Sequence, residues 1–371
     1  MISRAHKIRL YPNEKQRMML AKTAGTVRYA YNWAIDECER RYKQGLPFDI
    51  YAVSRTWTVE REAWAKEVPA ASVQKGILRA GGAYKNMFRH NAKHPKYHKK
   101  GVHDSFYINN QEGRVCGKKI KLGKIGCVRA AEPLRYEDCR IMSFNVSKEC
   151  NKWYVSVQVE ILEEARTNST SDVGVDVGLE HWAVATNGTV LKSPKQLKHY
   201  VRELKRKQRL AARKMKRSNN QKKAYGQIAK LYRKINNIKL DAIHKFTAAI
   251  AKNHGTVVIE DLNIDGMKKG QKSIRRGIQN AAMGEILRQL KYKCNNYVTV
   301  DRWYPSSQLC SSCGSRQEMP VDRRTYTCKV CGMSMDRDVN AALNILKEGR
   351  RIISTCGQHD NACGTTVDRA G

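Results

Sequence analysis

Four cysteines near the C-terminal end of the chain are spaced as ligands of one metal ion. Cys310 and Cys313 form one Cys-x-x-Cys pair, and Cys328 and Cys331 form a second pair after 14 intervening residues. Each such turn presents two thiolates, and Zn²⁺ prefers four of them in a tetrahedron. The sequence therefore predicts a zinc ribbon whose metal is structural, because protein atoms fill all four positions.

Disulfides are the alternative role for these cysteines. The chain has 12 cysteines, but the other eight are scattered without a pairing rhythm, and the start MISRAHKIRLYP lacks a signal peptide. Two Cys-x-x-Cys pairs in such a chain favour metal over disulfides, and we expect the remaining cysteines to be reduced.

Three acidic residues carry the second chemical signal. Asp176 interrupts the apolar run VGVDVGLE, where we expect it in the middle of a strand; Glu260 ends the buried run VVIE, and Asp338 is expected to cap a helix. An acid in an apolar strand is costly unless a cation meets it. Two strand acids and one helix acid form the ligand set with which ribonuclease H folds hold two divalent ions for phosphodiester cleavage. We therefore predict catalytic Mg²⁺, two ions in number, on Asp176, Glu260 and Asp338.

Two neighbouring acids could replace members of this trio. Asp261 competes with Glu260, but strand alternation cannot aim both side chains at one site. Asp336 competes with Asp338, and the choice depends on where the helix starts. We expect a buried stripe on that helix formed by Val339, Ala342, Leu343 and Leu346.

The charge of the chain points to a polyanionic partner. Its 371 residues include 70 Lys and Arg against 34 Asp and Glu, a formal charge of +36. Such an excess repels itself unless a polyanion is bound, which makes nucleic acid the first candidate. A membrane is the second, but no apolar run approaches the roughly 18 residues of a spanning helix. We expect a soluble, cytoplasmic, nucleoid-associated protein with no membrane partner.

The first half of the chain reads as helices followed by strands. A short strand at 6–12 precedes a helix capped by Asn13 that runs to Gly45, and a second helical region spans 51–91 with a break at Pro69. Short alternating runs at 95–163 are typical of a small β-barrel. Lysines lie among its aromatic residues, which suits phosphate binding with base stacking, and our candidates are Lys99, Lys100 and Lys119.

The second half has an α/β pattern after a Ser/Thr/Asn linker at 167–172. We expect a hairpin at 173–186, a basic helical region at 196–240 that breaks near 218–221 and continues to Ala251, and strands at 256–264 and 298–305 around a helix at 283–294. Between Lys195 and Lys239 there are 17 Lys or Arg and one acid. That skew predicts phosphate binding, with the candidates Lys205, Arg206, Arg209 and Arg213.

These motifs together resemble one known family. The runs GVDVGLE, VVIEDLNI and DRDVNAALNI, with RWYPSSQLCSSCG through CKVCG, are similar to the three RuvC motifs and the zinc-binding insertion of TnpB, the OrfB protein of bacterial insertion sequences. TVRYAYNWAIDECERRYKQG resembles the family's N-terminal helical signature, and PKYHKK followed by SFYI its middle segment. One departure is that MGEILRQLKYKC lacks the aromatic residue expected near the start of that helix.

The resemblance implies the fold class and the domains. The class is α/β and mixed, with an RNase H-like RuvC domain, a zinc-ribbon insertion, an N-terminal helical domain and a small β-barrel. The expected boundaries are 1–12 and 93–166 for a wedge-like barrel that binds nucleic acid, 13–92 for a helical recognition domain, 173–302 and 334–349 for RuvC, 303–333 for the zinc ribbon, and 350–371 for a disordered tail.

The resemblance also implies the activity. It is that of an RNA-guided DNA endonuclease encoded by a transposable element, a monomer on a guide RNA from the end of that element. The enzyme would cut double-stranded DNA beside a short adjacent motif, and the three acids would match the catalytic positions. Two alternatives stay open: a nuclease-silent RNA-guided repressor and a DNA-joining transposase. A repressor has no need of three acids, whereas a transposase would need an end-recognition domain that we do not find.

Overall fold

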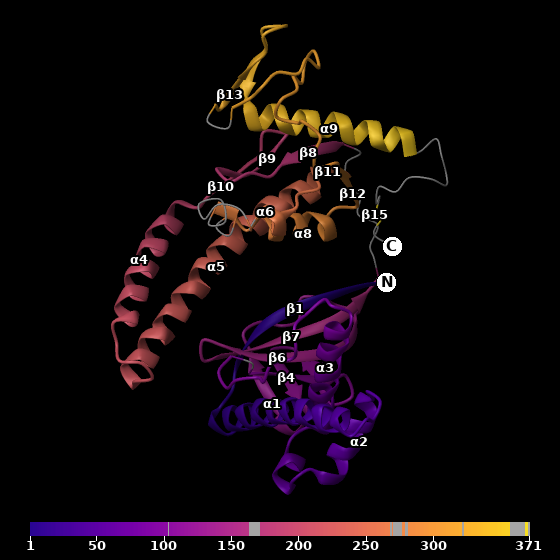
Figure 1. The fold of residues 1–371 in the computed structure, drawn as a ribbon, viewed down its shortest axis with the longest axis vertical. Helices are drawn as coiled ribbons and strands as arrows, with labels where there is room; N and C mark the ends of the chain where they lie inside the picture. The colour runs from indigo at the N-terminus through magenta and orange to yellow at the C-terminus, as the bar shows by residue number, and fades with distance from the viewer. Residues whose placement is uncertain are drawn as a thin grey trace. The chain divides into compact units, whose positions relative to one another are not determined.

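The computed structural model describes residues 1–102, 104–162, 171–267, 269, 277–278, 281–320, 323–356 and 368–369, which divide into two compact units. Unit 1 spans Met1–Glu164 and unit 2 spans Ala165–Gly371. The expected linker and the basic loop at 266–277 fall largely outside the described residues. Figure 1 labels many of the elements of both units.

Unit 1 is a seven-stranded antiparallel sheet with helices packed on it. Its strands in chain order are β1 (Ile2–Tyr11), β2 (Ser105–Asn109), β3 (Gly113–Cys116), β4 (Lys119–Leu122), β5 (Cys127–Ala130), β6 (Arg140–Glu149) and β7 (Lys152–Ile161). The spatial order is β2-β6-β7-β1-β5-β4-β3. Within the described residues β2 and β3 are the sheet edges, so the expected barrel is an open half-barrel. The N-terminal strand lies inside this sheet, between β7 and β5.

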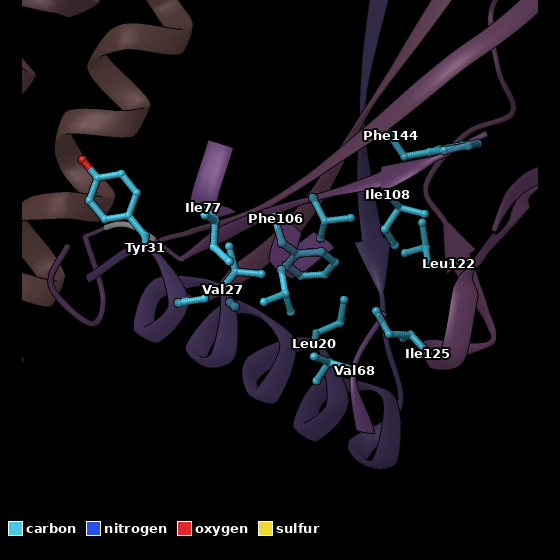
Figure 2. Close-up of a cluster of buried hydrophobic side chains, with 14 of the residues drawn as sticks. Leu20, Val27, Tyr31, Val68, Ile77, Phe106, Ile108, Leu122, Ile125 and Phe144 are labelled. Carbon is cyan, nitrogen blue, oxygen red and sulfur yellow. The ribbon is translucent and has the colours of Figure 1, made fainter. Parts of the chain in front are cut away.

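The α-helices of unit 1 lie in the helical regions that the sequence predicted. They are α1 (Glu14–Lys43), α2 (Ile50–Glu60) and α3 (Ala70–Phe88), accompanied by the short 3-10 turns η1 (Ala63–Glu67) and η2 (Gly123–Ile125). The predicted cap of α1 is confirmed, because Asn13 and Gln16 form a reciprocal capping box. Figure 2 shows how Leu20 and Val27 of α1 and Ile77 of α3 meet Phe106 and other strand residues in one apolar core.

Unit 2 is built on a second, mixed sheet. Its strands are β8 (Asp172–Asp176), β9 (His181–Ala185), β10 (Val190–Lys192), β11 (Thr256–Glu260), β12 (Asn296–Val300) and β15 (Asp368–Arg369), in the order β10-β9-β8-β11-β12-β15. β11 pairs in parallel with β8 and β12, a pairing typical of strands with a continuous apolar run. The predicted hairpin of β8 and β9 is confirmed.

Five helices and a small hairpin complete the described part of unit 2. The basic helices are α4 (Lys195–Ala212) and α5 (Asn219–Asn253); α6 (Ile264–Met267), α8 (Met283–Lys293) and α9 (Arg337–Cys356) follow, and β13 (Thr325–Thr327) pairs with β14 (Ser334–Asp336). Figure 1 shows α9 lying along β8 and β11.

Several expected boundaries were wrong. The strand expected at 298–305 ends at Val300, and the one expected to reach Ile264 ends at Glu260. Asp176 is the last residue of β8 and does not lie in its middle. α9 continues to Cys356, so the first residues of the expected tail are helical. The rest of that tail, apart from β15, lies outside the described residues.

The buried face of α9 also differs from the expected stripe. Ala342 and Leu346 are buried as predicted, but Val339 and Leu343 are only half-buried. Ala341 and Ile345 are buried instead, together with the two asparagines Asn340 and Asn344. Polar residues are buried here because α9 is covered on more than one side, by the sheet and by the loop at 306–311.

Candidate functional site

The three predicted acids come together at the C-terminal ends of β8 and β11, the two central strands of the unit 2 sheet. Ile259 is aligned with Val175 in the parallel pair, so Glu260, the last residue of β11, lies level with Asp176, the last residue of β8. Asp338 lies in the first turn of α9, which packs on β8. The carboxyl groups of Glu260 and Asp338 both act electrostatically on that of Asp176.

Glycines allow α9 to approach the sheet closely enough to deliver Asp338. A Cβ atom on Gly174 would lie 2.2 Å from the Ala342 backbone oxygen, and one on Gly349 would lie 2.3 Å from Val258 Cγ1. Both distances are shorter than any tolerated contact, so only glycine fits at these two crossing points. The position of Asp338 beside Asp176 therefore depends on direct backbone contact between helix and strand.

The electrostatics of the cluster favour a bound cation. Burial, with repulsion from Glu260 and Asp338, raises the pKa of Asp176 to about 8, although Arg337 opposes the shift. Burial also raises the pKa of Glu260, against a hydrogen bond from Ser306. Desolvated carboxyl groups that repel one another become stable as anions when a divalent ion joins them. All three donors are carboxylate oxygens, a set that fits Mg²⁺.

Two residues that the sequence analysis did not name contact this cluster. His181 Nδ1 lies 3.2 Å from Asp338 Oδ2, and the Asp338 side chain is only 13% exposed. The Ser306 hydroxyl donates a hydrogen bond to Glu260 Oε1. His181 could have been suspected as a polar residue that opens the apolar strand paired with β8. Nothing in the local sequence distinguishes Ser306 from the other serines of its loop.

The two competing acids are engaged elsewhere. The Asp261 carboxylate is half exposed and forms an ion pair with Arg302. Asp336 Oδ1 accepts hydrogen bonds from the backbone N–H groups of Asp338 and Val339, at 2.9 and 3.2 Å. Asp336 therefore caps α9, and our expectation that Asp338 is the cap was wrong. Asp338 is instead the second residue of α9, and its Oδ2 atom lies 3.2 Å from Nδ1 of His181.

The four ribbon cysteines have the geometry of a zinc site. All four Sγ atoms lie within 4.8 Å of one another, with Cys310–Cys331 and Cys313–Cys328 separations of 3.6 Å. A tetrahedron with Zn–S bonds of 2.3 Å has edges of about 3.8 Å. Gly314 and Gly332 each follow a second cysteine of a pair with φ of 76° and 71°, the left-handed conformation that closes both turns. The four thiol groups fit one zinc ion.

The predicted nucleic-acid contacts are exposed but lie in both units. Lys205, Arg206 and Arg209 project from α4 and Arg213 from its C-terminal end, whereas Lys99 and Lys100 lie in a loop and Lys119 begins β4. A cavity of about 360 Å³ between α4 and α5 is lined by Lys207, Lys214 and Lys223. The structure thus places a concentration of positive charge on the α4–α5 pair.

Comparisons with known proteins cover nearly the whole chain. The OrfB_IS605 family, described as a probable transposase, matches residues 154–271; a Cas12f1-like TNB domain matches 284–345, and the family's helix-turn-helix domain matches 1–46. In the structure, residues 1–46 contain the strand β1 and the single long helix α1.

Two relatives and one solved structure are similar over most of their length. A protein of Streptomyces pristinaespiralis and the protein InsQ of Escherichia coli K12 are both named as RNA-guided DNA endonucleases, and each is 31% identical to this chain. The two alignments cover 96% and 95% of this chain, and 91% and 94% of the respective relatives. The Cas12f1 chain of a Cas12f1-sgRNA-target DNA complex has a TM-score of 0.59 at 15% identity, over 93% of this chain and 98% of its own. The mixed α/β, RuvC-containing fold class predicted from the sequence is confirmed. None of the helices in the described ranges is long and apolar enough to cross a membrane.

Proposed function

Because this chain belongs to the OrfB (TnpB) family, we propose that it is an RNA-guided DNA endonuclease that cuts double-stranded target DNA. The observation that carries the proposal is the cluster of Asp176, Glu260 and Asp338 on β8, β11 and α9. A repressor without nuclease activity has no use for three clustered acids, two of which, Asp176 and Glu260, have pKa values raised by desolvation at a cost to the folded protein.

The three acids would hold the catalytic Mg²⁺. When bound, the ions would activate water and stabilise the leaving oxygen of the phosphodiester. The chain's own residues set the geometry: His181 holds the carboxylate of Asp338, and Ser306 holds that of Glu260. The parallel pairing of β8 and β11 keeps Asp176 and Glu260 side by side at the C-terminal ends of two central strands.

The basic surfaces of both units would bind the nucleic acids. In this proposal the half-barrel of unit 1 with Lys99, Lys100 and Lys119, and the α4–α5 pair with Lys205, Arg206, Arg209 and Arg213, bind the guide RNA and its hybrid with DNA. A hybrid is held by its A-form shape and phosphates, which calls for a cationic surface more than for base-reading side chains. The helical segment 13–92 would read the motif beside the target, and the zinc ribbon 303–333 would stiffen the RuvC site. A DNA substrate would place this activity in the bacterial cytoplasm, at the nucleoid.

A pair of variants on one strand tests the nuclease assignment. Asp176→Ala should abolish cleavage of target DNA while guide-RNA binding stays intact, because only the ligand set is lost. Asp172→Asn, at the other end of β8, should retain cleavage, since Asp172 is paired with Arg350 away from the cluster. Both variants are measured with the RNA that co-purifies with the protein. Cleavage that survives in Asp176→Ala would refute the assignment, and strand joining without RNA would favour a transposase.

A further inference from the structure

One side of α9 holds the loop at 306–311 by hydrogen bonds to its backbone. Asn344 Nδ2 donates to the carbonyl oxygens of Ser306 at 2.8 Å and Leu309 at 2.7 Å. Asn340 Nδ2 donates to the same Leu309 oxygen at 2.7 Å, and Asn340 Oδ1 accepts from the Ser311 N–H at 2.9 Å. Lys347 Nζ adds a bond to the Ser311 carbonyl oxygen. Residues 340, 344 and 347 share one helix face, so a single side of α9 clamps the loop.

Both asparagines are buried, which makes their hydrogen bonds consequential. Asn340 is 0% exposed and Asn344 is 2% exposed. A buried amide is tolerated only when it is paired, and removing it would leave the loop carbonyls unpaired as well. The loop forms no strand within the described residues. Apart from the isolated bridge of Leu309 with Arg316, short-range backbone bonds hold it, such as those from the N–H groups of Gln308 to Pro305 and of Cys310 to Ser315, so the asparagines supply its hydrogen bonds to α9.

The clamped loop connects the two metal-binding groups of unit 2. At its start, Ser306 is 7% exposed, and its hydroxyl donates to Glu260 Oε1. At its end, Ser311 lies between the paired ribbon cysteines Cys310 and Cys313. Asn344 holds the carbonyl of the same Ser306 whose hydroxyl orients Glu260. The helix that carries the clamp also carries Asp338, two residues before Asn340.

We propose that Asn344, assisted by Asn340, is a positioning residue of the nuclease site. It fixes Ser306, and through the Ser306 hydroxyl the Glu260 carboxylate, relative to the helix that carries Asp338, and it ties the zinc ribbon to the same loop. This inference rests on the proposed function. Partners behind the ligands of a metal site change its affinity about 10- to 100-fold when they are removed.

Metal binding by the full-length, zinc-loaded protein tests this role. The probe is Mn²⁺, titrated into the protein and followed by electron paramagnetic resonance. Asn344→Ala should raise the Kd of the Asp176-dependent Mn²⁺ site by about 10- to 100-fold. Ser306→Ala should have an effect of similar size while leaving α9 unchanged. The double variant should be no worse than the more impaired single variant, because both changes break the same path.

A matched control separates positioning from general destabilisation. Thr247 is also 0% exposed and hydrogen-bonded, to Ile243 and Gln289, but it lies in α5 outside the clamp. Thr247→Val should lower the thermal midpoint with no change in Mn²⁺ affinity, and metal analysis should find about one zinc per chain in every variant. Unchanged Mn²⁺ affinity in both Asn344→Ala and Ser306→Ala, or additive effects in the double variant, would overturn the inference while the nuclease assignment stands. If the wild type shows no Asp176-dependent Mn²⁺ site, the proposed function itself fails.

Discussion

At the scale of single residues, the site depends on Asp176 being held in a place that disfavours its charge. Its carboxyl group is desolvated and faces two further acids, so its pKa rises to about 8. The metal-free protein therefore holds Asp176 in the neutral form at neutral pH. In the proposed function a divalent ion would displace that proton, and the three acids would be favourable as anions only with the metal bound.

This placement gives the metal-free protein a specific pH dependence. The unfolded chain releases the Asp176 proton near pH 4, whereas the folded protein releases it near pH 8. The contribution of the Asp176 proton to the free energy of unfolding is therefore complete below about pH 4. It is lost as pH rises toward 8, at up to about 1.4 kcal/mol per pH unit.

Asp176→Asn should remove this dependence. In Mg²⁺-free buffer its thermal unfolding midpoint should exceed that of the wild type, and the difference should grow from pH 5 to pH 8. Saturating Mg²⁺ should stabilise the wild type more than the variant, because only the wild type retains the full ligand set. Equal pH profiles for the two proteins in differential scanning fluorimetry would contradict this account of Asp176.

At the scale of elements, the crossing of α9 over β8 decides where Asp338 lies. Gly174 permits that crossing, since any side chain there would run into the Ala342 backbone. Apolar packing then holds the helix on the sheet, in a cluster formed by Val258, Val298, Val300, Ile345 and Leu346. Helix α9 is thus fixed on one side by apolar packing and on another by the asparagine clamp.

Two Gly→Ala substitutions in unit 2 test this crossing. Gly174→Ala should destabilise the protein by about 1–3 kcal/mol, because the new methyl group must push α9 away. Gly226→Ala, at an exposed position of α5 with no atom within 4 Å of the added Cβ, should be neutral or stabilising by up to about 1 kcal/mol. Urea denaturation monitored by circular dichroism measures both. If Gly174→Ala is as benign as Gly226→Ala, the close crossing is wrong.

At the scale of the whole molecule, the charge of +36 is the dominant property. Much of it is concentrated on α4, α5 and the turn between them, where 17 Lys or Arg from Lys195 to Lys239 accompany a single acid, Glu203. Glu203 is already paired with Lys207 on the same helix. So dense a set of like charges repels itself in the free protein, and a bound polyanion relieves that repulsion.

Reversing charges on α4 should weaken binding of the co-purifying RNA. Lys205, Arg206, Arg209 and Arg213 changed together to Glu should lower the affinity and flatten its salt dependence, by about 0.7 to 0.9 in log–log slope for each phosphate that is no longer neutralised. Lys245→Glu is the comparison on α5, because Lys245 is already paired with Asp241 and should contribute little. An unaltered slope in filter-binding titrations from 50 to 300 mM salt, a range of about sixfold, would mean that these four residues face bulk solvent.

Much of the fold and the candidate site could be predicted from local features of the sequence. The two Cys-x-x-Cys pairs define their zinc geometry through their own turns, and the apolar run ending at Glu260 could form only a buried strand. The cap at Asn13 and the basic helices likewise depend on neighbours close in the chain. Such features were predicted well because their energetics are local.

The contacts between distant segments were decided only by the tertiary structure. Whether Asp336 or Asp338 joins the acidic cluster depends on which of them caps α9. Asp336 is the cap because β14 ends at this residue and α9 begins directly after it. Gly174, Asn340 and Asn344 acquire their roles from a helix that crosses a strand far away in the sequence and is covered by a loop on another side. The apolar periodicity of the sequence describes a helix that is covered on one face. It therefore predicted an apolar stripe on α9 and missed the buried Asn340 and Asn344. Residue types and their local spacing define which groups can do the chemistry. Long-range packing decides which of these groups meet, because burial and backbone contact arise only when the segments come together.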